Sequence, residues 1–74
     1  MMRRGYNPMG ADNIDKVEYD GRTKTLYVKL LSGKTFVHYD VTHLEHVSLI
    51  SSESQEDYYL THIYDKYRSR TIEP

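Results

Sequence analysis

Apolar and polar residues alternate through the first half of the chain, and this pattern predicts three consecutive β-strands. The strands cover residues 14–19, 24–31 and 34–41, and the last is rich in β-branched and aromatic residues. Asp20-Gly21-Arg22-Thr23 and Ser32-Gly33 separate them, and residues of these types favour tight turns. Because short turns join strands that run in opposite directions, we expect an antiparallel meander.

The length of the second turn decides which residues of the second and third strands face each other. If Ser32-Gly33 is the whole loop, three pairs form the apolar face of the sheet: Leu30 with Thr35, Val28 with Val37, and Leu26 with Tyr39. The opposite face then carries two further pairs: Tyr27 with His38, and Lys29 with Phe36. A longer loop would change this register.

After the third strand the spacing of apolar residues changes to that of a helix. Thr42 is a favourable N-cap, and Glu45 three residues later completes the pattern of a capping box. An apolar stripe follows at helical spacing, formed by Leu44, Val47 and Ile50 with Leu49 beside them. These features predict a short helix from His43 to about Ser51.

Ser54 is placed to cap a second helix, whose first turn holds Glu56 and Asp57. The apolar stripe of this helix is Tyr59, Leu60, Ile63 and Tyr67. We therefore predict an α+β fold, in which a three-stranded antiparallel meander is followed by two short helices packed on one face, in the order β-β-β-α-α.

The chain has 74 residues, a length that corresponds to a single domain. We place this domain at residues 14–68, after a flexible N-terminal arm of residues 1–13 that is polar and contains Gly and Pro. Residues 69–74 are expected to be frayed. Cysteine is absent from the sequence, which excludes disulfides and thiolate metal sites.

The formal net charge of −1 differs from the positive excess that is typical of proteins binding the phosphate backbone. The distribution is uneven, however, because residues 22–34 carry basic residues and no acidic one. No signal peptide is recognised, and no stretch approaches the roughly 20 apolar residues of a membrane span. We therefore expect a cytoplasmic protein without a membrane partner.

Three segments carry a resemblance to a known family: Asn13-Ile14-Asp15-Lys16-Val17-Glu18-Tyr19-Asp20, Leu26-Tyr27-Val28 and Gly33-Lys34-Thr35-Phe36-Val37-His38-Tyr39-Asp40-Val41. Together they resemble the KTSC domain, which occurs at the C-terminus of some lysyl-tRNA synthetases and as small stand-alone bacterial and phage proteins. The later part of the family pattern matches Leu49, Ser54, Tyr58-Tyr59, Ile63 and Tyr67. The resemblance covers roughly residues 12–67 and implies, through the synthetase context, a function in RNA binding.

This chain departs from the family pattern at three places. The central Tyr-x-Tyr of the family is Phe36-Val37-His38 here, a usual Pro is Thr42, and a usual Gly between the helices is Glu56. The loss of both tyrosine hydroxyls from the central motif weakens any inference of a contact that needs them.

The predicted sheet face opposite the helices is the first candidate site. It would combine aromatic rings with cations, an arrangement on which single-stranded bases stack. The candidate nucleic-acid-binding residues are Arg22, Lys24, Tyr27, Lys29, Lys34, Phe36 and His38. The same side chains could instead simply cover the back of the sheet or pack in a dimer.

Other chemistry finds little support in the sequence. His43 and His46 have a spacing that can place two imidazoles near one metal, but no third ligand is evident, so we expect neither a metal nor a cofactor. No nucleophile elbow, phosphate loop or metalloprotease motif is present, and we expect neither catalysis nor a small-molecule substrate.

The sequence thus predicts a small non-catalytic binding module, and two hypotheses for its partner stay open. The first is RNA, bound through the face of the sheet that the helices leave uncovered. The second is a protein partner or a second copy of the chain, which eight tyrosines, a small core and free sheet edges favour.

Overall fold

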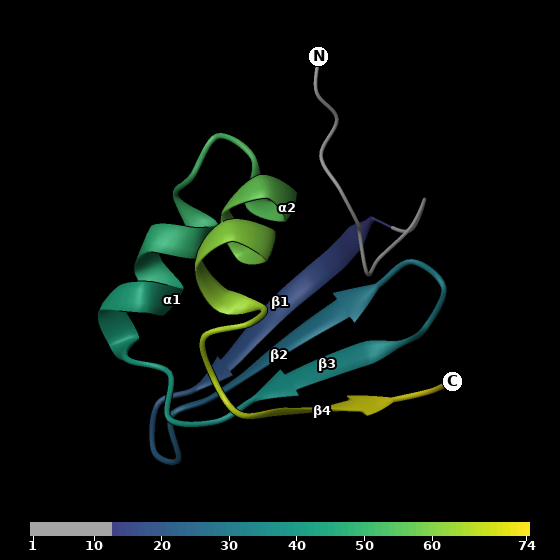
Figure 1. The fold of residues 1–74 in the computed structure, drawn as a ribbon, viewed down its shortest axis with the longest axis horizontal. Coiled ribbons are helices and arrows are strands. Elements are labelled where there is room, and N and C mark those ends of the chain that lie inside the picture. Colours follow the sequence, from purple (N-terminus) through teal and green to yellow (C-terminus); the bar gives the residue numbers. More distant parts are fainter. Residues whose placement is uncertain (1–12) are drawn as a thin grey trace.

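A four-stranded antiparallel sheet with helices on one face is the frame of the structure, a computed structural model in which residues 13–74 are described (Figure 1). In chain order its elements are β1 (Ile14–Asp20), β2 (Thr25–Leu30), β3 (Thr35–His38), α1 (His43–Ile50), α2 (Gln55–Tyr58), η1 (Tyr59–Ile63) and β4 (Ser69–Ile72). The α+β class and the antiparallel meander of the first three strands are confirmed.

The turn between β2 and β3 contains three residues, so the two-residue loop on which the expected register depends does not occur. The amide of Gly33 donates to the carbonyl of Leu30 at 2.9 Å, and the amide of Leu30 donates to the carbonyl of Lys34 at 2.8 Å. Gly33 has a φ of 100°, in the left-handed region that only glycine occupies without strain. These features are typical of a turn followed by a glycine bulge, the usual form of a three-residue hairpin loop.

The longer turn shifts the register by one residue and exchanges the two faces of β3. Val28 lies opposite Phe36, and Leu26 lies opposite His38. Phe36 and His38 therefore point toward the helices, where both side chains are buried. Val37 takes the place on the uncovered face that the sequence had assigned to them.

The chain end adds a fourth strand, where the sequence predicted a frayed segment at 69–74. β4 pairs with β3 in antiparallel register, with Val37 opposite Arg70 and Thr35 opposite Ile72. The pairing extends past β3, since the amide of Tyr39 donates to the carbonyl of Arg68 at 3.0 Å. Of the predicted arm at 1–13, only Asn13 lies within the described residues, and its carbonyl accepts from the amide of Leu31 at 2.9 Å.

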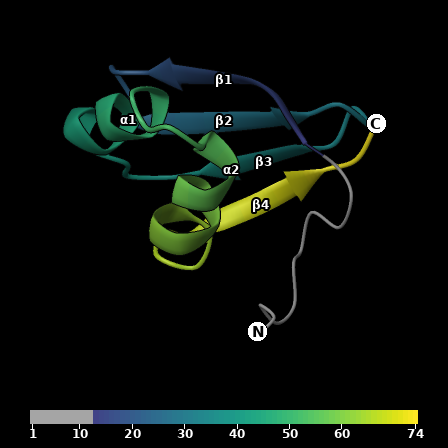
Figure 2. The same ribbon diagram turned by 90° about the horizontal axis from the view of Figure 1, so that it is seen from above.

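Both helical segments lie on the same side of the sheet (Figure 2). Thr42 caps α1, its hydroxyl accepting from the amide of Glu45 at 3.1 Å, as the sequence predicts. Ser54 caps α2 in the same way, accepting from the amide of Asp57 at 3.3 Å. The second helix then continues as η1, one turn of π-helix.

The core lies between the sheet and the helices. Its buried members are Leu26, Val28, Leu30, Phe36, Val41, Leu49, Tyr59 and Ile63. The predicted burial of Tyr59 and Ile63 on the second helix is confirmed. The predicted stripe of α1 is wrong, because Leu49 is the one buried residue of that helix and Leu44, Val47 and Ile50 are exposed.

Glu45 joins the helical segments on the polar side of this layer. Its carboxylate accepts hydrogen bonds from the hydroxyls of Tyr58 and Tyr67, the latter at 3.0 Å. Burial of the phenol and the bond to Glu45 raise the pKa of Tyr67 to about 12. One carboxylate on α1 therefore holds both the end of α2 and the segment that leads to β4.

The face of the sheet turned away from the helices is called the open face below. By the alternation along each strand it carries Lys16, Glu18, Asp20, Thr25, Tyr27, Lys29, Thr35, Val37, Arg70 and Ile72.

Replacing Gly33 with Ala is expected to destabilise the protein by about 1–2 kcal/mol, the cost of holding a residue with a Cβ in the left-handed region. The added Cβ would also lie 3.1 Å from the Cβ of Pro74. Urea unfolding followed by circular dichroism measures the effect. The matched control is Gly21→Ala, whose added Cβ would meet nothing closer than 3.7 Å. Equal changes in the two variants would contradict the assignment of Gly33 as the residue that sets the register.

Candidate functional site

Phe36 and His38, two of the predicted base-stacking residues, lie in the core and not on the open face. The Phe36 ring packs against Tyr59 and Tyr64, with centroids 6.0 and 5.6 Å apart. His38 Nε2 and the hydroxyl of Tyr59 share a hydrogen bond of 2.6 Å. Neither ring can therefore stack on a base from this position.

The environment of His38 favours the neutral imidazole. Removal from water lowers the pKa of His38 to about 4. Within residues 13–74, the buried Nδ1 atom has no hydrogen-bond partner, so a protonated ring would bury an N–H without an acceptor. Burial and the neighbouring Tyr64 raise the pKa of Tyr59. The pair is thus a neutral hydrogen bond between β3 and η1.

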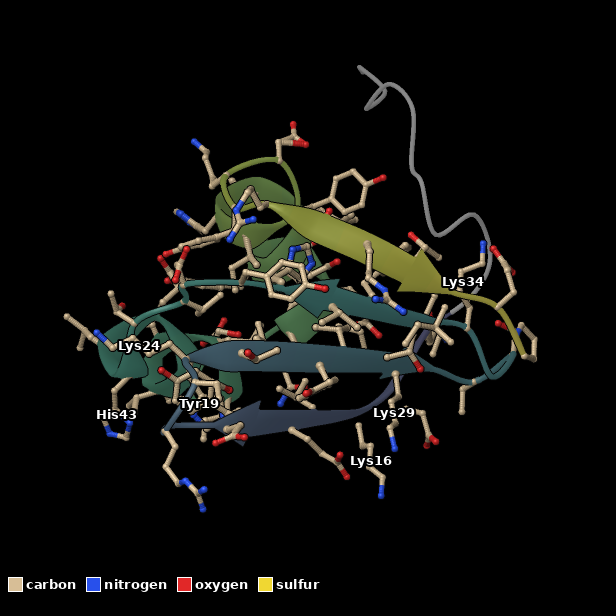
Figure 3. All side chains as sticks on the ribbon, turned by 90° about the horizontal axis from the view of Figure 1, so that it is seen from below. Lys16, Tyr19, Lys24, Lys29, Lys34 and His43 are labelled. Atoms are coloured by element: carbon tan, nitrogen blue, oxygen red, sulfur yellow. The ribbon has the colours of Figure 1, made fainter. Side chains whose placement is uncertain are left out.

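The predicted cations are spread over the molecule (Figure 3). Lys24 and Lys34 lie at opposite ends of the sheet. Lys29 is on the open face, but its Nζ lies 3.7 Å from a carboxylate oxygen of Glu18, which also pairs with Lys16 at 3.4 Å. Exposed Arg22 lies in the β1–β2 turn. The structure does not gather these four basic residues into one patch.

The open face instead has a shallow hollow of about 400 Å³ over β2 and β3. It is lined by Asp20, Thr23, Thr25, Tyr27, Val37, Tyr39, Arg70 and Ile72. Thr25 and Val37 are buried beneath it and form its floor. Tyr27 lies on β2 opposite Val37, and Tyr39 follows directly after the end of β3, two residues beyond Val37. Of the predicted site residues, Tyr27 alone lines this hollow.

Two arginines reach this region from the chain end. Arg70 lies on β4 opposite Val37 and lines the hollow. The guanidinium carbon of Arg68 lies 5.3 Å from the ring centroid of Tyr39, within the range of a cation–π contact, and Arg68 pairs with Asp40 at 3.4 Å. Neither is among the nucleic-acid-binding residues that the sequence predicts, although Arg68, Arg70 and Ile72 recur at every second position as in a strand.

The opposite side of the hollow is acidic. Asp20, at the end of β1, lies opposite Thr25 and lines the hollow. Its Oδ1 atom accepts from the amide of Arg22 at 3.0 Å. The hollow therefore has a carboxylate on its β1 side, a guanidinium on its β4 side and tyrosine rings between them.

The two histidines considered as metal ligands belong to another surface. The ring of His46 stacks on Tyr19, with centroids 4.6 Å apart. Burial and the nearby His43 lower the pKa of His46. Among residues 13–74, no group of three or more His, Cys, Asp or Glu side chains is arranged to hold a metal ion. No helix in this part of the chain is long and apolar enough to cross a membrane.

The order of these elements agrees with comparisons to known proteins. The family model of the KTSC domain matches residues 11–67. The chain belongs to the KTSC domain family. The crystal structure of a KTSC domain protein from Yersinia pestis aligns with a TM-score of 0.76 and 21% sequence identity, covering 84% of this chain and 86% of that one. A comparison with curated proteins gives no match.

The likeness to the Yersinia protein concerns the fold. In this KTSC domain the two positions of the family's Tyr-x-Tyr motif, Phe36 and His38, are core positions. The residue between them, Val37, is the one that faces the hollow. The two outer positions of the motif thus pack against the helices, and only its middle residue belongs to the open face.

Lowering the pH from 6.5 to 4 is expected to reduce the stability of this domain by on the order of 2 to 3 kcal/mol through His38. The unfolded chain takes up this proton near pH 6.5, but the folded protein does so only near pH 4, so the stability is complete above pH 6.5 and falls through that window. Urea unfolding at several pH values measures the slope.

The variant His38→Gln removes the titrating group and can still bond to Tyr59, so its unfolding free energy should depend less on pH. His62→Gln, at an exposed position, should keep the slope of the wild type. An unchanged slope in His38→Gln would show that His38 is not the group responsible.

Proposed function

We propose that this KTSC domain is a non-catalytic module that binds single-stranded RNA on its open face, with one base in the hollow between Tyr27 and Tyr39. The observation that carries the proposal is the placement of two tyrosines beside a hollow whose β4 side is formed by Arg70. Aromatic rings that stack bases, together with cations for the phosphates, are the common device of sheet modules that bind single strands.

The stacking surface supports this function energetically. A base that stacks on an aromatic side chain contributes about 1–3 kcal/mol, and every base can do so. Thr25 and Val37 beneath the hollow are already covered by their neighbours, so an entering base contacts mainly the side chains that surround them. Tyr27 and Tyr39 remain partly exposed and are available to a ligand.

The charges of the open face favour a small electrostatic contribution. Arg70 on β4 and Arg68 directly before it add cations on the side from which a phosphate can approach. Asp40 partly offsets Arg68, and Glu18 offsets Lys29. With about two phosphates neutralised, the logarithm of the affinity should fall with the logarithm of salt concentration with a slope of roughly 1.4.

Titration of the labelled protein with a mixed-sequence single-stranded RNA at low salt is expected to shift the NMR signals of Tyr27, Tyr39 and Arg70. Tyr39→Ala should weaken binding by roughly 5- to 150-fold, corresponding to the loss of one stacked base. Tyr39→Phe is the matched control and should bind as the wild type does, because the ring is kept. Similarly, Arg70→Ala should weaken binding and reduce the salt dependence, whereas Lys66→Ala should change neither.

Absence of binding at low salt, where phosphate contacts are strongest, would contradict the RNA proposal. So would binding that is equally strong in Tyr39→Ala and Tyr39→Phe, because it would have to occur elsewhere on the domain. Circular dichroism of each variant confirms that the fold is intact.

A second surface favours self-association as an alternative function. Leu44, Val47 and Ile50 lie three residues apart along α1, on one side of the helix, and are 73, 39 and 46% exposed. The carboxylate of α1, on Glu45, is bound to Tyr58 and Tyr67 and does not interrupt this apolar stripe.

A second copy of the chain fits the α1 stripe because antiparallel packing of two α1 helices would bring the opposite ends of their dipoles together. The three apolar side chains of each copy would bury far less surface than the roughly 800 Å² per partner of a standard interface. This dimer should therefore be weak.

Light scattering after size exclusion is therefore expected to show a dimer only at high protein concentration. Leu44→Asp should abolish it, because a carboxylate would be buried in the contact. Leu31→Asp is the matched control, since Leu31 is 65% exposed in the β2–β3 turn, away from α1. A wild type that stays monomeric at millimolar concentration, or equal effects of both substitutions, would contradict self-association through α1.

A further inference from the structure

The hollow on the open face has a fixed acceptor on its β1 side. Asp20 lines it, and the amide of Arg22 holds Oδ1 of the carboxylate at 3.0 Å. The bond from the Arg22 amide thus fixes the orientation of the Asp20 side chain. The Oδ2 atom and the remaining lone pair of Oδ1 can still accept further hydrogen bonds. A ligand in the hollow therefore meets two adjacent acceptors that cannot donate.

The four RNA bases differ in how many hydrogen bonds their edges can donate to this pair of acceptors. Guanine presents two neighbouring donors, N1–H and the 2-amino group. Adenine and cytosine each present one donor beside an acceptor, and uracil presents one donor between two acceptors. Only guanine can therefore make two parallel hydrogen bonds to a carboxylate, and bonds of this charge-assisted kind are the stronger ones.

The charges across the sheet fix the direction of the nucleotide. Asp20 belongs to β1 and Arg70 to β4, so three strand spacings, about 14 Å, separate the two strands. A nucleotide lying across β2 and β3 with its base edge toward Asp20 places its phosphate on the side of Arg70. In the reverse direction the phosphate would face the carboxylate of Asp20 and be repelled.

We infer that the hollow selects guanine: the base lies between Tyr27 and Tyr39, its N1–H and 2-amino groups donate to the carboxylate of Asp20, and its phosphate contacts Arg70. This inference rests on the proposed binding of single-stranded RNA and adds the identity of the bound base. Any base can stack on the tyrosines, so the selectivity for guanine comes from the hydrogen bonds to Asp20.

The experiment compares short uridine oligomers that differ at one central position, which is guanine, inosine, adenine, cytosine or uracil. A single guanine in such an oligomer cannot fold on itself, so fluorescence anisotropy reports binding of the single strand. We expect the guanine oligomer to bind roughly 5- to 150-fold more tightly than the uracil oligomer, the range for a bidentate contact. Inosine keeps N1–H but lacks the 2-amino group, and should bind with intermediate affinity.

The variant Asp20→Asn tests the residue itself. Its amide oxygen can still accept from Arg22, so the turn is kept, but the side chain now offers one acceptor and one donor. The preference for guanine should disappear, because adenine, cytosine and uracil each present a donor beside an acceptor and can pair with the Asn side chain, whereas guanine can no longer make two bonds to it. Asp65→Asn, an exposed position beyond η1, is the matched control and should leave the order of affinities as it is.

The outcomes separate this inference from the proposed function. Failure of every oligomer to bind would overturn both. Equal affinity for all five oligomers, or a guanine preference that survives in Asp20→Asn, would overturn the guanine assignment and leave RNA binding standing. An unchanged urea midpoint for Asp20→Asn shows that the comparison is made on folded protein.

Discussion

The left-handed conformation of Gly33 is the constraint on which the rest of the structure depends. Because Gly33 adopts a φ of 100°, the β2–β3 turn holds three residues and Val28 pairs with Phe36. Strand side chains alternate between faces, so this single pairing decides the direction of every side chain in β3. It buries His38 beneath the helices and turns Val37 toward the open face.

The same constraint explains how the two layers are connected. His38 meets the hydroxyl of Tyr59 on η1, which gives a buried polar group one partner and fixes the helical layer over β3. On the far edge of β3, the pairing with β4 brings Arg70 beside the tyrosines of the open face. One face of the sheet thus forms part of the core, and the other is the open face with its hollow.

The sequence predicted the strands, the caps of both helices and the burial of Tyr59, because each depends on local chemistry or on a clear period. It could not decide the register, since residues 34–41 carry apolar side chains on both faces and Ser32-Gly33 suits turns of either length. It missed β4 because Ser-Arg-Thr-Ile is short and polar, and its pairing is a tertiary contact. The exposed stripe of α1 has the same spacing as a buried one, so periodicity alone could not distinguish them.

The central claim is therefore the pairing of β2 with β3, and a cross-strand nuclear Overhauser experiment on the labelled protein tests it directly. The account predicts contacts between the backbones of Val28 and Phe36 and between those of Leu26 and His38. Contacts from Val28 to Val37 instead would mean a two-residue turn. They would place Phe36 and His38 on the open face, and the hollow between Tyr27 and Tyr39 would not exist as described.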